Sequence, residues 1–171
     1  NLRLKQVVKE TLQAGDFPLV FGGDHALAIG SISATLTPDT GILWIDAHGD
    51  CNTVESSPSH RIHGMPLAVL QGFGHPRLTF MNDVVLKARD ILQIGIRALD
   101  HQEQIQMDLW GVRYLTMKDI RSKGFDWMMK ELQAFEADHP RIHFSFDFEI
   151  IDPKEETGVN TTEKNGLSLQ E

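Results

Sequence analysis

The sequence predicts an α/β protein with a mostly parallel β-sheet that helices cover on both faces. Two observations lead to this prediction. Short apolar runs of strand length alternate along the chain with segments of helical periodicity. Two of these runs, residues 17–21 and 41–45, are apolar throughout, which is typical of parallel strands buried on both faces. With 171 residues, 41% of them hydrophobic, the chain can bury the core of one domain, so we expect a single domain over residues 1–171.

The first quarter of the chain predicts one helix, one strand and a second helix. Apolar residues recur at helical spacing over residues 2–12, and Gly15 stands where that helix would end. The apolar run 17–21 predicts a short strand. A tight turn follows over residues 22–25, because two glycines allow the backbone to reverse sharply. Residues 26–32 predict the next helix.

The remaining elements continue the alternation. Four further apolar runs predict strands over residues 41–45, 91–96, 112–115 and 141–146. A polar loop is expected over residues 46–62, a helix from about Met65, and another helix over residues 125–132. Residues 154–163 predict a loop, and residues 167–171 the start of an element without a partner in this chain. Ligands of open α/β sheets bind beyond the carboxyl ends of the strands, where the chemically suggestive residues fall.

Composition and charge exclude several classes of function. The 16 basic and 24 acidic residues give a net charge of −8, which disfavours nucleic-acid binding. No run approaches the roughly 18 apolar residues of a membrane span, and the first residues do not resemble a signal peptide. The single cysteine, Cys51, excludes an internal disulfide and fits a reducing cytoplasm, which is the expected location. The absence of an initial Met suggests that the chain begins inside a larger protein.

Two strand ends and one turn carry candidate metal ligands. Asp46, His48 and Asp50 alternate after a predicted strand, so their side chains can converge. Carboxylate and imidazole together suit Mn²⁺, Fe²⁺, Co²⁺ or Zn²⁺ better than Ca²⁺. Coincidental spacing in a polar loop is the alternative for this segment. Further candidates are His25, which alone is more often structural, and the pair Asp147 and Glu149 at another strand end. Together they suffice for two ions that share carboxylates.

These segments resemble the ureohydrolase family, which contains the arginases and agmatinases, and most of all bacterial arginases. The resemblance covers nearly the whole chain and is carried by PLVFGGDHALAIGSI, DAHGDCNT, IHGMPLAV, GFGHP, IGIRALD and SFDFEIIDP. It implies a three-layer α/β/α fold, here incomplete at both ends, and a site for two Mn²⁺ or another divalent metal. It also implies a homo-oligomer, usually a trimer or hexamer.

The resemblance further implies a role for each site residue. His25 and Asp50 would bind the first ion, His48 and Glu149 the second, and Asp46 and Asp147 would bridge. A hydroxide held between the ions would attack the guanidinium carbon of L-arginine and yield L-ornithine and urea.

His63, a proton shuttle, and Asp50 would be the catalytic residues. The expected substrate contacts are Asn52, Ser57 and Ser59 for the α-carboxylate, Asp100 for the α-ammonium, and Glu103 as a second acid. Ordinary loop capping is the alternative for the Ser and Asn residues.

Three features depart from the family pattern. Glu149 stands where the family has Asp, and the added methylene predicts weaker or altered occupancy of the second ion. His60 and Arg61 replace an expected Gly-Asn pair, so that Arg61 would either pair with a carboxylate or crowd the site. Residues 154–162 lack a usual proline. The C-terminal portion of the family, which supplies a guanidinium-binding glutamate, cannot be assigned here.

These departures leave other functions open. The protein could act on agmatine or guanidinobutyrate, or be a divergent arginase-like protein with little or no activity. An unrelated metal hydrolase is the third alternative, which the order of the motifs disfavours.

Overall fold

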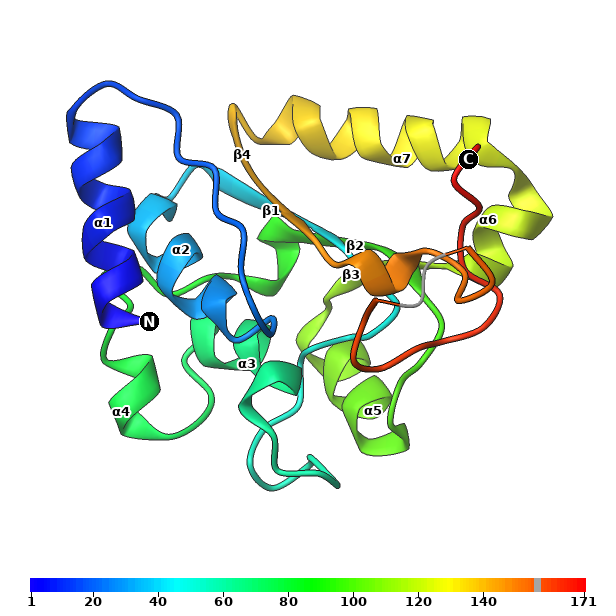
Figure 1. Ribbon diagram of the computed structural model, residues 1–171, viewed down its shortest axis with the longest axis horizontal. Coiled ribbons are helices and arrows are strands. Elements are labelled where there is room, and N and C mark those ends of the chain that lie inside the picture. The colour runs from blue at the N-terminus through cyan, green and yellow to red at the C-terminus, as the bar shows by residue number, and fades with distance from the viewer. Residues whose placement is uncertain (156–157) are drawn as a thin grey trace.

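The fold is built on one four-stranded parallel sheet with the strand order β3-β2-β1-β4 (Figure 1). The computed structural model describes residues 1–155 and 158–171. The strands are β1 (Thr40–Ile45), β2 (Ile91–Ile96), β3 (Arg113–Thr116) and β4 (Arg141–Phe146). The helices are α1 (Leu2–Gln13), α2 (Leu27–Thr35), α3 (Pro66–Leu70), α4 (Pro76–Thr79), α5 (His101–Trp110), α6 (Met117–Lys123) and α7 (Phe125–Asp138). Short 3₁₀ turns span Ile62–Gly64, Ala88–Asp90 and Phe148–Ile150.

Successive side chains of β1 face opposite helical layers. Ile42 and Trp44 pack with residues of α2, α3 and α5 in one core cluster. Leu43 packs with residues of α6 and α7 in another. Since neighbouring residues of a strand point to opposite faces, both faces of the sheet are covered. The predicted three-layer α/β/α architecture with a parallel sheet is confirmed.

The strand order creates the position of the site. From β1 the chain proceeds through β2 to β3 on one side, and β4 then pairs with β1 on the other side. Ile45 and Phe146 are partners at the carboxyl ends of β1 and β4. Beyond them, the amide of Asp147 donates to the carbonyl oxygen of Ile45 over 2.9 Å. Such a reversal of strand order is where ligands bind in open α/β sheets.

Two expectations about individual segments are wrong. Residues 17–21 form no strand, and Phe17 and Phe21 are 87% and 82% exposed. An apolar run of this length does not reveal whether a neighbouring strand exists to pair with it, and none does among the described residues. Residues 167–171 were expected to lack a partner, but Leu167 forms a parallel bridge with Ile151. The predicted loop 154–163 contains residues 156 and 157, which lie outside the described part of the chain.

Within the described residues, none of the helices combines the length and apolar character that crossing a bilayer requires.

Candidate metal centre

Asp46 lies at the centre of the site. It follows β1 directly and is 1% exposed. Its Oδ2 accepts a hydrogen bond from the indole Nε1 of Trp44 over 3.2 Å, and its Oδ1 accepts one from the amide of His48 over 2.9 Å. Two groups of side chains have the arrangement of metal ligands: His25, Asp46 and Asp147 in one, and Asp46, His48 and Glu149 in the other. Asp46 belongs to both groups, as a bridging ligand would.

His25 directs one ring nitrogen into the first group. Its Nδ1 lies 2.9 Å from Asp46 Oδ2, 3.2 Å from Asp50 Oδ2 and 3.3 Å from Asp147 Oδ2. The Nε2 on the other side of the ring is 2.9 Å from the hydroxyl of Ser145. The turn that carries His25 is held by a hydrogen bond from the Ala26 amide to the Asp24 carboxylate. His25 therefore joins three carboxylates even though no strand precedes it.

His48 plays the corresponding part in the second group. Its Nδ1 lies 2.8 Å from Glu149 Oε2 and 3.5 Å from Asp46 Oδ1. Glu149 follows Asp147 in a 3₁₀ turn, where the Glu149 amide donates to Asp147 Oδ1 over 2.9 Å. Asp147 thus touches the first group with one oxygen and orients Glu149 with the other.

Burial and neighbouring charges shift the pKa values of both imidazoles and of Asp50. Burial lowers the pKa of His25, but hydrogen bonds to Asp147, Asp46 and Asp50 outweigh it, so that the net pKa lies well above the ordinary value. Burial likewise lowers the pKa of His48, and Asp46 and Glu149 raise it to about 11. The pKa of Asp50 is raised by burial and by the charge of Asp46.

These shifts show that the site suits a cation. The carboxylates draw positive charge onto both imidazoles, because clustered buried acids repel each other without it. A divalent ion supplies the same positive charge, and the oxygen and nitrogen donors match Mn²⁺ and its neighbours in the first transition row. Both histidines point the same atom, Nδ1, at the carboxylates. The residues therefore fit the binuclear site that the resemblance implies.

The loop after β1 is strained and tightly packed at its fourth and fifth residues. Asp50 has φ of +49°, a left-handed conformation uncommon for a residue with a side chain. A Cβ on Gly49 would lie 2.6 Å from Leu99 Cδ2 and 2.9 Å from Met107 Sδ, so a larger residue there would require these side chains to move. Backbone strain of this kind is typical of functional sites.

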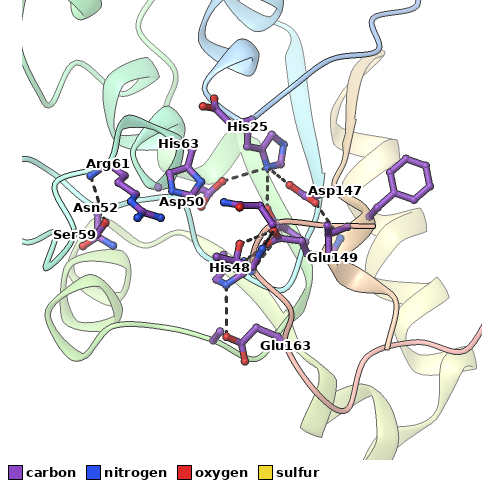
Figure 2. A pocket seen from close by; sticks show the side chains of 18 of the residues that line it. His25, His48, Asp50, Asn52, Ser59, Arg61, His63, Asp147, Glu149 and Glu163 are labelled. Atoms are coloured by element: carbon purple, nitrogen blue, oxygen red, sulfur yellow. Dashed lines mark hydrogen bonds and ion pairs between the residues drawn. The ribbon is translucent and has the colours of Figure 1, made fainter. Parts of the chain in front are cut away.

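All thirteen residues singled out from the sequence line one cavity of about 850 Å³. Figure 2 shows His25, Asp50 and Asp147 turned toward one another, with Asn52, Ser59 and Arg61 on the wall away from Glu149. The thirteen residues are His25, Asp46, His48, Asp50, Asn52, Ser57, Ser59, Arg61, His63, Asp100, Glu103, Asp147 and Glu149.

The polar residues of the loop 52–61 largely bind one another. Asn52 accepts from the Ser56 hydroxyl over 2.8 Å and donates to Asp100 over 3.1 Å. The hydroxyls of Ser57 and Ser59 accept from the amides of His60 and Arg61. The capping alternative is thus present, and these bonds hold the hydroxyls at the cavity wall.

Glu103 is a buried anchor beside the cavity. Its side chain accepts hydrogen bonds from the amides of Cys51 and Asp100, and with Asp100 it forms the capping box that begins α5. Burial raises its pKa to about 7. Glu103 therefore joins the loop after β1 to the start of α5.

Four partners of the ligands were not anticipated from the sequence. Trp44 donates to Asp46, and Ser145 contacts His25. Thr161 donates to Glu149, and the Glu163 carboxylate lies 3.9 Å from His48 Nε2. Because side chains alternate along a strand, the sequence could have placed Ser145 on the same side of β4 as His143. No local pattern in the sequence indicates the contacts that Trp44, Thr161 and Glu163 make.

The chain is similar to known proteins over its whole length. A sequence profile described as "Arginase family" matches residues 1–171. The chain is 39% identical over 176 residues to an arginase of Bacillus caldovelox, covering 100% of this chain and 59% of the relative. The chain thus spans about three fifths of the length of the curated relatives it matches.

Solved structures give the same result. The fold matches an arginase from Bacillus cereus with a TM-score of 0.94 and 37% identity, over 98% of this chain and 60% of that one. It matches an Entamoeba histolytica arginase, solved in complex with L-ornithine, with a TM-score of 0.92 and 33% identity, over 99% and 59%.

Proposed function

The chain belongs to the arginase family, and from this premise we propose that the full-length protein hydrolyses the guanidinium group of L-arginine to L-ornithine and urea. The observation that carries the proposal is the pair of ligand groups that share Asp46 where β1 and β4 end. The carboxylate-reading loop on the cavity wall favours arginine over agmatine, which lacks an α-carboxylate.

Two Mn²⁺ fit the six ligands proposed for them. His25 and Asp50 would hold one ion, His48 and Glu149 the other, and Asp46 and Asp147 would lie between the two. The Nδ1 distances of 2.9–3.3 Å around His25 and of 2.8 Å between His48 and Glu149 support the two sets of ligands, and the presence of Asp46 in both groups supports its place between the ions. When bound, such a metal pair lowers the pKa of a bound water to about 7 and polarises the guanidinium.

His63 is the proposed proton carrier. Hydrolysis adds water to the guanidinium carbon and breaks the bond from that carbon to the δ-nitrogen of ornithine, which must gain a proton as it leaves. His63 sits in the 3₁₀ turn Ile62–Gly64 on the cavity wall and is half-buried. From this wall its imidazole would deliver that proton from a ring nitrogen.

The amino-acid end of the substrate would meet the opposite wall. Asn52, Ser57 and Ser59 would bind the α-carboxylate, and the Arg61 guanidinium can add two parallel hydrogen bonds to it. Asp100 would meet the α-ammonium. Glu103, held by two backbone amides, would keep Asp100 in place and add negative charge near it.

We also propose a cytoplasmic homo-oligomer, a trimer or hexamer. Cys51 is a free, buried thiol, the state expected in a reducing compartment. Light scattering on the full-length protein tests the assembly.

A second candidate function is that of a divergent member with little or no turnover. The observation that favours it concerns Glu149. Its Oε1 is engaged by the amide and hydroxyl of Thr161, which leaves Oε2 to face His48. The added methylene of Glu also places this carboxylate differently from that of the shorter Asp, which would alter the occupancy of the second ion.

A urea assay with added Mn²⁺ on arginine, agmatine and guanidinobutyrate separates the candidates. Arginine turnover that falls on chelation and returns with Mn²⁺ supports the main proposal. Urea from agmatine but none from arginine would defeat the argument from the carboxylate loop. No urea from any substrate, with Mn²⁺ bound, would favour the divergent member.

A further inference from the structure

Residues 160–163 form a short segment, here called the site strap, that passes along the cavity wall beside the second ligand group. Asn160, Thr161 and Glu163 line the cavity. The guanidinium of Arg97 holds the strap at its end, donating from Nη2 to the Glu163 carbonyl over 2.9 Å and from Nε to the Lys164 carbonyl over 3.1 Å. The strap is thereby fixed to the end of β2.

The same guanidinium also secures a metal ligand. Arg97 donates to the carbonyl oxygens of Glu149 and Gly95. Its charge is therefore distributed over backbone carbonyls of three segments: the end of β2, the turn after β4 and the strap. These bonds fix the distance between Glu149 and the strap residues that face it.

Thr161 determines which oxygen of Glu149 is free. The Thr161 amide donates to Glu149 Oε1 over 2.9 Å, and the Thr161 hydroxyl donates to the same oxygen. The other oxygen, Oε2, is the one that lies 2.8 Å from His48 Nδ1. Thr161 thus turns the longer side chain of Glu149 toward its group.

Glu163 faces the outer side of His48. Its Oε1 lies 3.9 Å from His48 Nε2, while Nδ1 on the opposite side of the ring faces the ligand carboxylates (Figure 2). A histidine that binds metal through one nitrogen commonly donates the other N–H to a carboxylate, which fixes the ring and makes it a stronger ligand. His25 has the neutral Ser145 hydroxyl in that place. The two groups therefore differ in their outer partners.

We propose that Thr161 and Glu163 are positioning residues for the second ligand group. The Glu163 carboxylate faces the outer nitrogen of His48 and Thr161 orients Glu149, so that the strap acts on this group through two ligands that the first group does not contain. The inference rests on the proposed function insofar as it takes the two groups to be metal sites. Glu149 is longer than the Asp of the family pattern. The strap compensates for this extra length by holding the Glu149 carboxylate in one orientation.

Calorimetric titration of Mn²⁺ into the metal-free full-length protein tests the proposal. Glu163→Gln and Thr161→Val should each weaken one of the two binding events about 10- to 100-fold and leave the other unchanged. Thr161→Ser, which keeps the hydroxyl, should retain the affinity. The free energy of unfolding of the metal-free Glu163→Gln protein should not change, because the Glu163 side chain is 41% exposed.

A matched control removes an acid that precedes the strap in the loop 154–163 and does not line the cavity. Glu155 accepts a hydrogen bond from the Leu169 amide, and Glu155→Gln should leave both Mn²⁺ affinities unchanged. Equal affinities in Glu163→Gln, Thr161→Val and the natural protein would overturn the inference and leave the proposed function standing. A raised KM for arginine in Glu163→Gln with unchanged Mn²⁺ binding would overturn it too, by making Glu163 a substrate contact. A natural protein that binds no Mn²⁺ would defeat both proposals.

Discussion

The imidazole of His25 lies flat against the indole of Trp44, with ring centroids 3.8 Å apart and planes inclined by 15°. The same indole donates to the Asp46 carboxylate. Trp44 is fully buried in β1, so one core side chain positions ligands from two segments. The first ligand group is therefore partly built by the hydrophobic core beneath it.

Replacing this indole should weaken the first group. Trp44→Phe keeps an aromatic ring under His25 but removes the donor to Asp46, and the loss of a hydrogen bond to a buried charge costs about 1.5–3 kcal/mol. We expect a lower free energy of unfolding in urea and weaker Mn²⁺ binding by calorimetry. Trp127→Phe is the control, since that ring packs under the Lys123 ammonium, away from the ligands. Unchanged Mn²⁺ binding in Trp44→Phe would show that the indole does not position Asp46.

Shortening Glu149 should improve the second group. Glu149→Asp restores the residue that the family pattern has at this position, and we expect higher occupancy of the second Mn²⁺ and a higher kcat with arginine. Metal analysis after dialysis gives the occupancy. Two tightly held Mn²⁺ in the natural protein would contradict the expected weakness of its second site.

The pair His60 and Arg61 should influence the choice of substrate. His60 has φ of +54°, so His60→Gly relieves about 1 kcal/mol of backbone strain and should raise the free energy of unfolding. If Arg61 reads the α-carboxylate, Arg61→Asn should lower kcat/KM for arginine and leave that for agmatine unchanged. If Arg61 instead crowds the site, the variant that carries both His60→Gly and Arg61→Asn should have a higher activity with arginine. No change with either substrate would exclude this loop as the cause of altered function.

His143 should make the fold less stable in mild acid. Burial lowers its pKa from 6.5 to about 4, while Nδ1 lies 2.7 Å from the Thr35 hydroxyl. The unfolded chain therefore binds a proton more readily between these pH values, and stability falls as the pH decreases from 6.5 toward 4. The loss should reach about 2 kcal/mol at pH 5 and increase further toward pH 4.

Urea denaturation of the metal-free protein at about pH 7.5 and about pH 5 measures this loss, because the ordinary His pKa of 6.5 lies between these two pH values. His143→Asn keeps a group that can bond to Thr35 but does not titrate. Its stability should depend less on pH than that of the natural protein, since the ligand carboxylates and imidazoles titrate in both. Equal pH dependence would show that His143 is not the responsible group.

Local patterns predicted the bounds of two strands, 91–96 and 141–146. The first is buried throughout, whereas Ile142, Phe144 and Phe146 of the second are exposed. Helix α5 was not anticipated, since polar side chains interrupt its periodicity. Its signals are the capping box of Asp100 and Glu103 and the left-handed Gly111 that ends it.

The residues by themselves determined the chemistry of this protein: acids and histidines in three segments, two of them at strand ends, and a family resemblance carried by their order. Only the tertiary structure decided how those segments meet. Pairing of β4 with β1 places Asp147 beside Asp46, and folding of the strap places Thr161 and Glu163 against Glu149 and His48. The physical reason is that contacts between distant segments depend on which strands pair and which loops are anchored, and neither leaves a periodic signal in the chain.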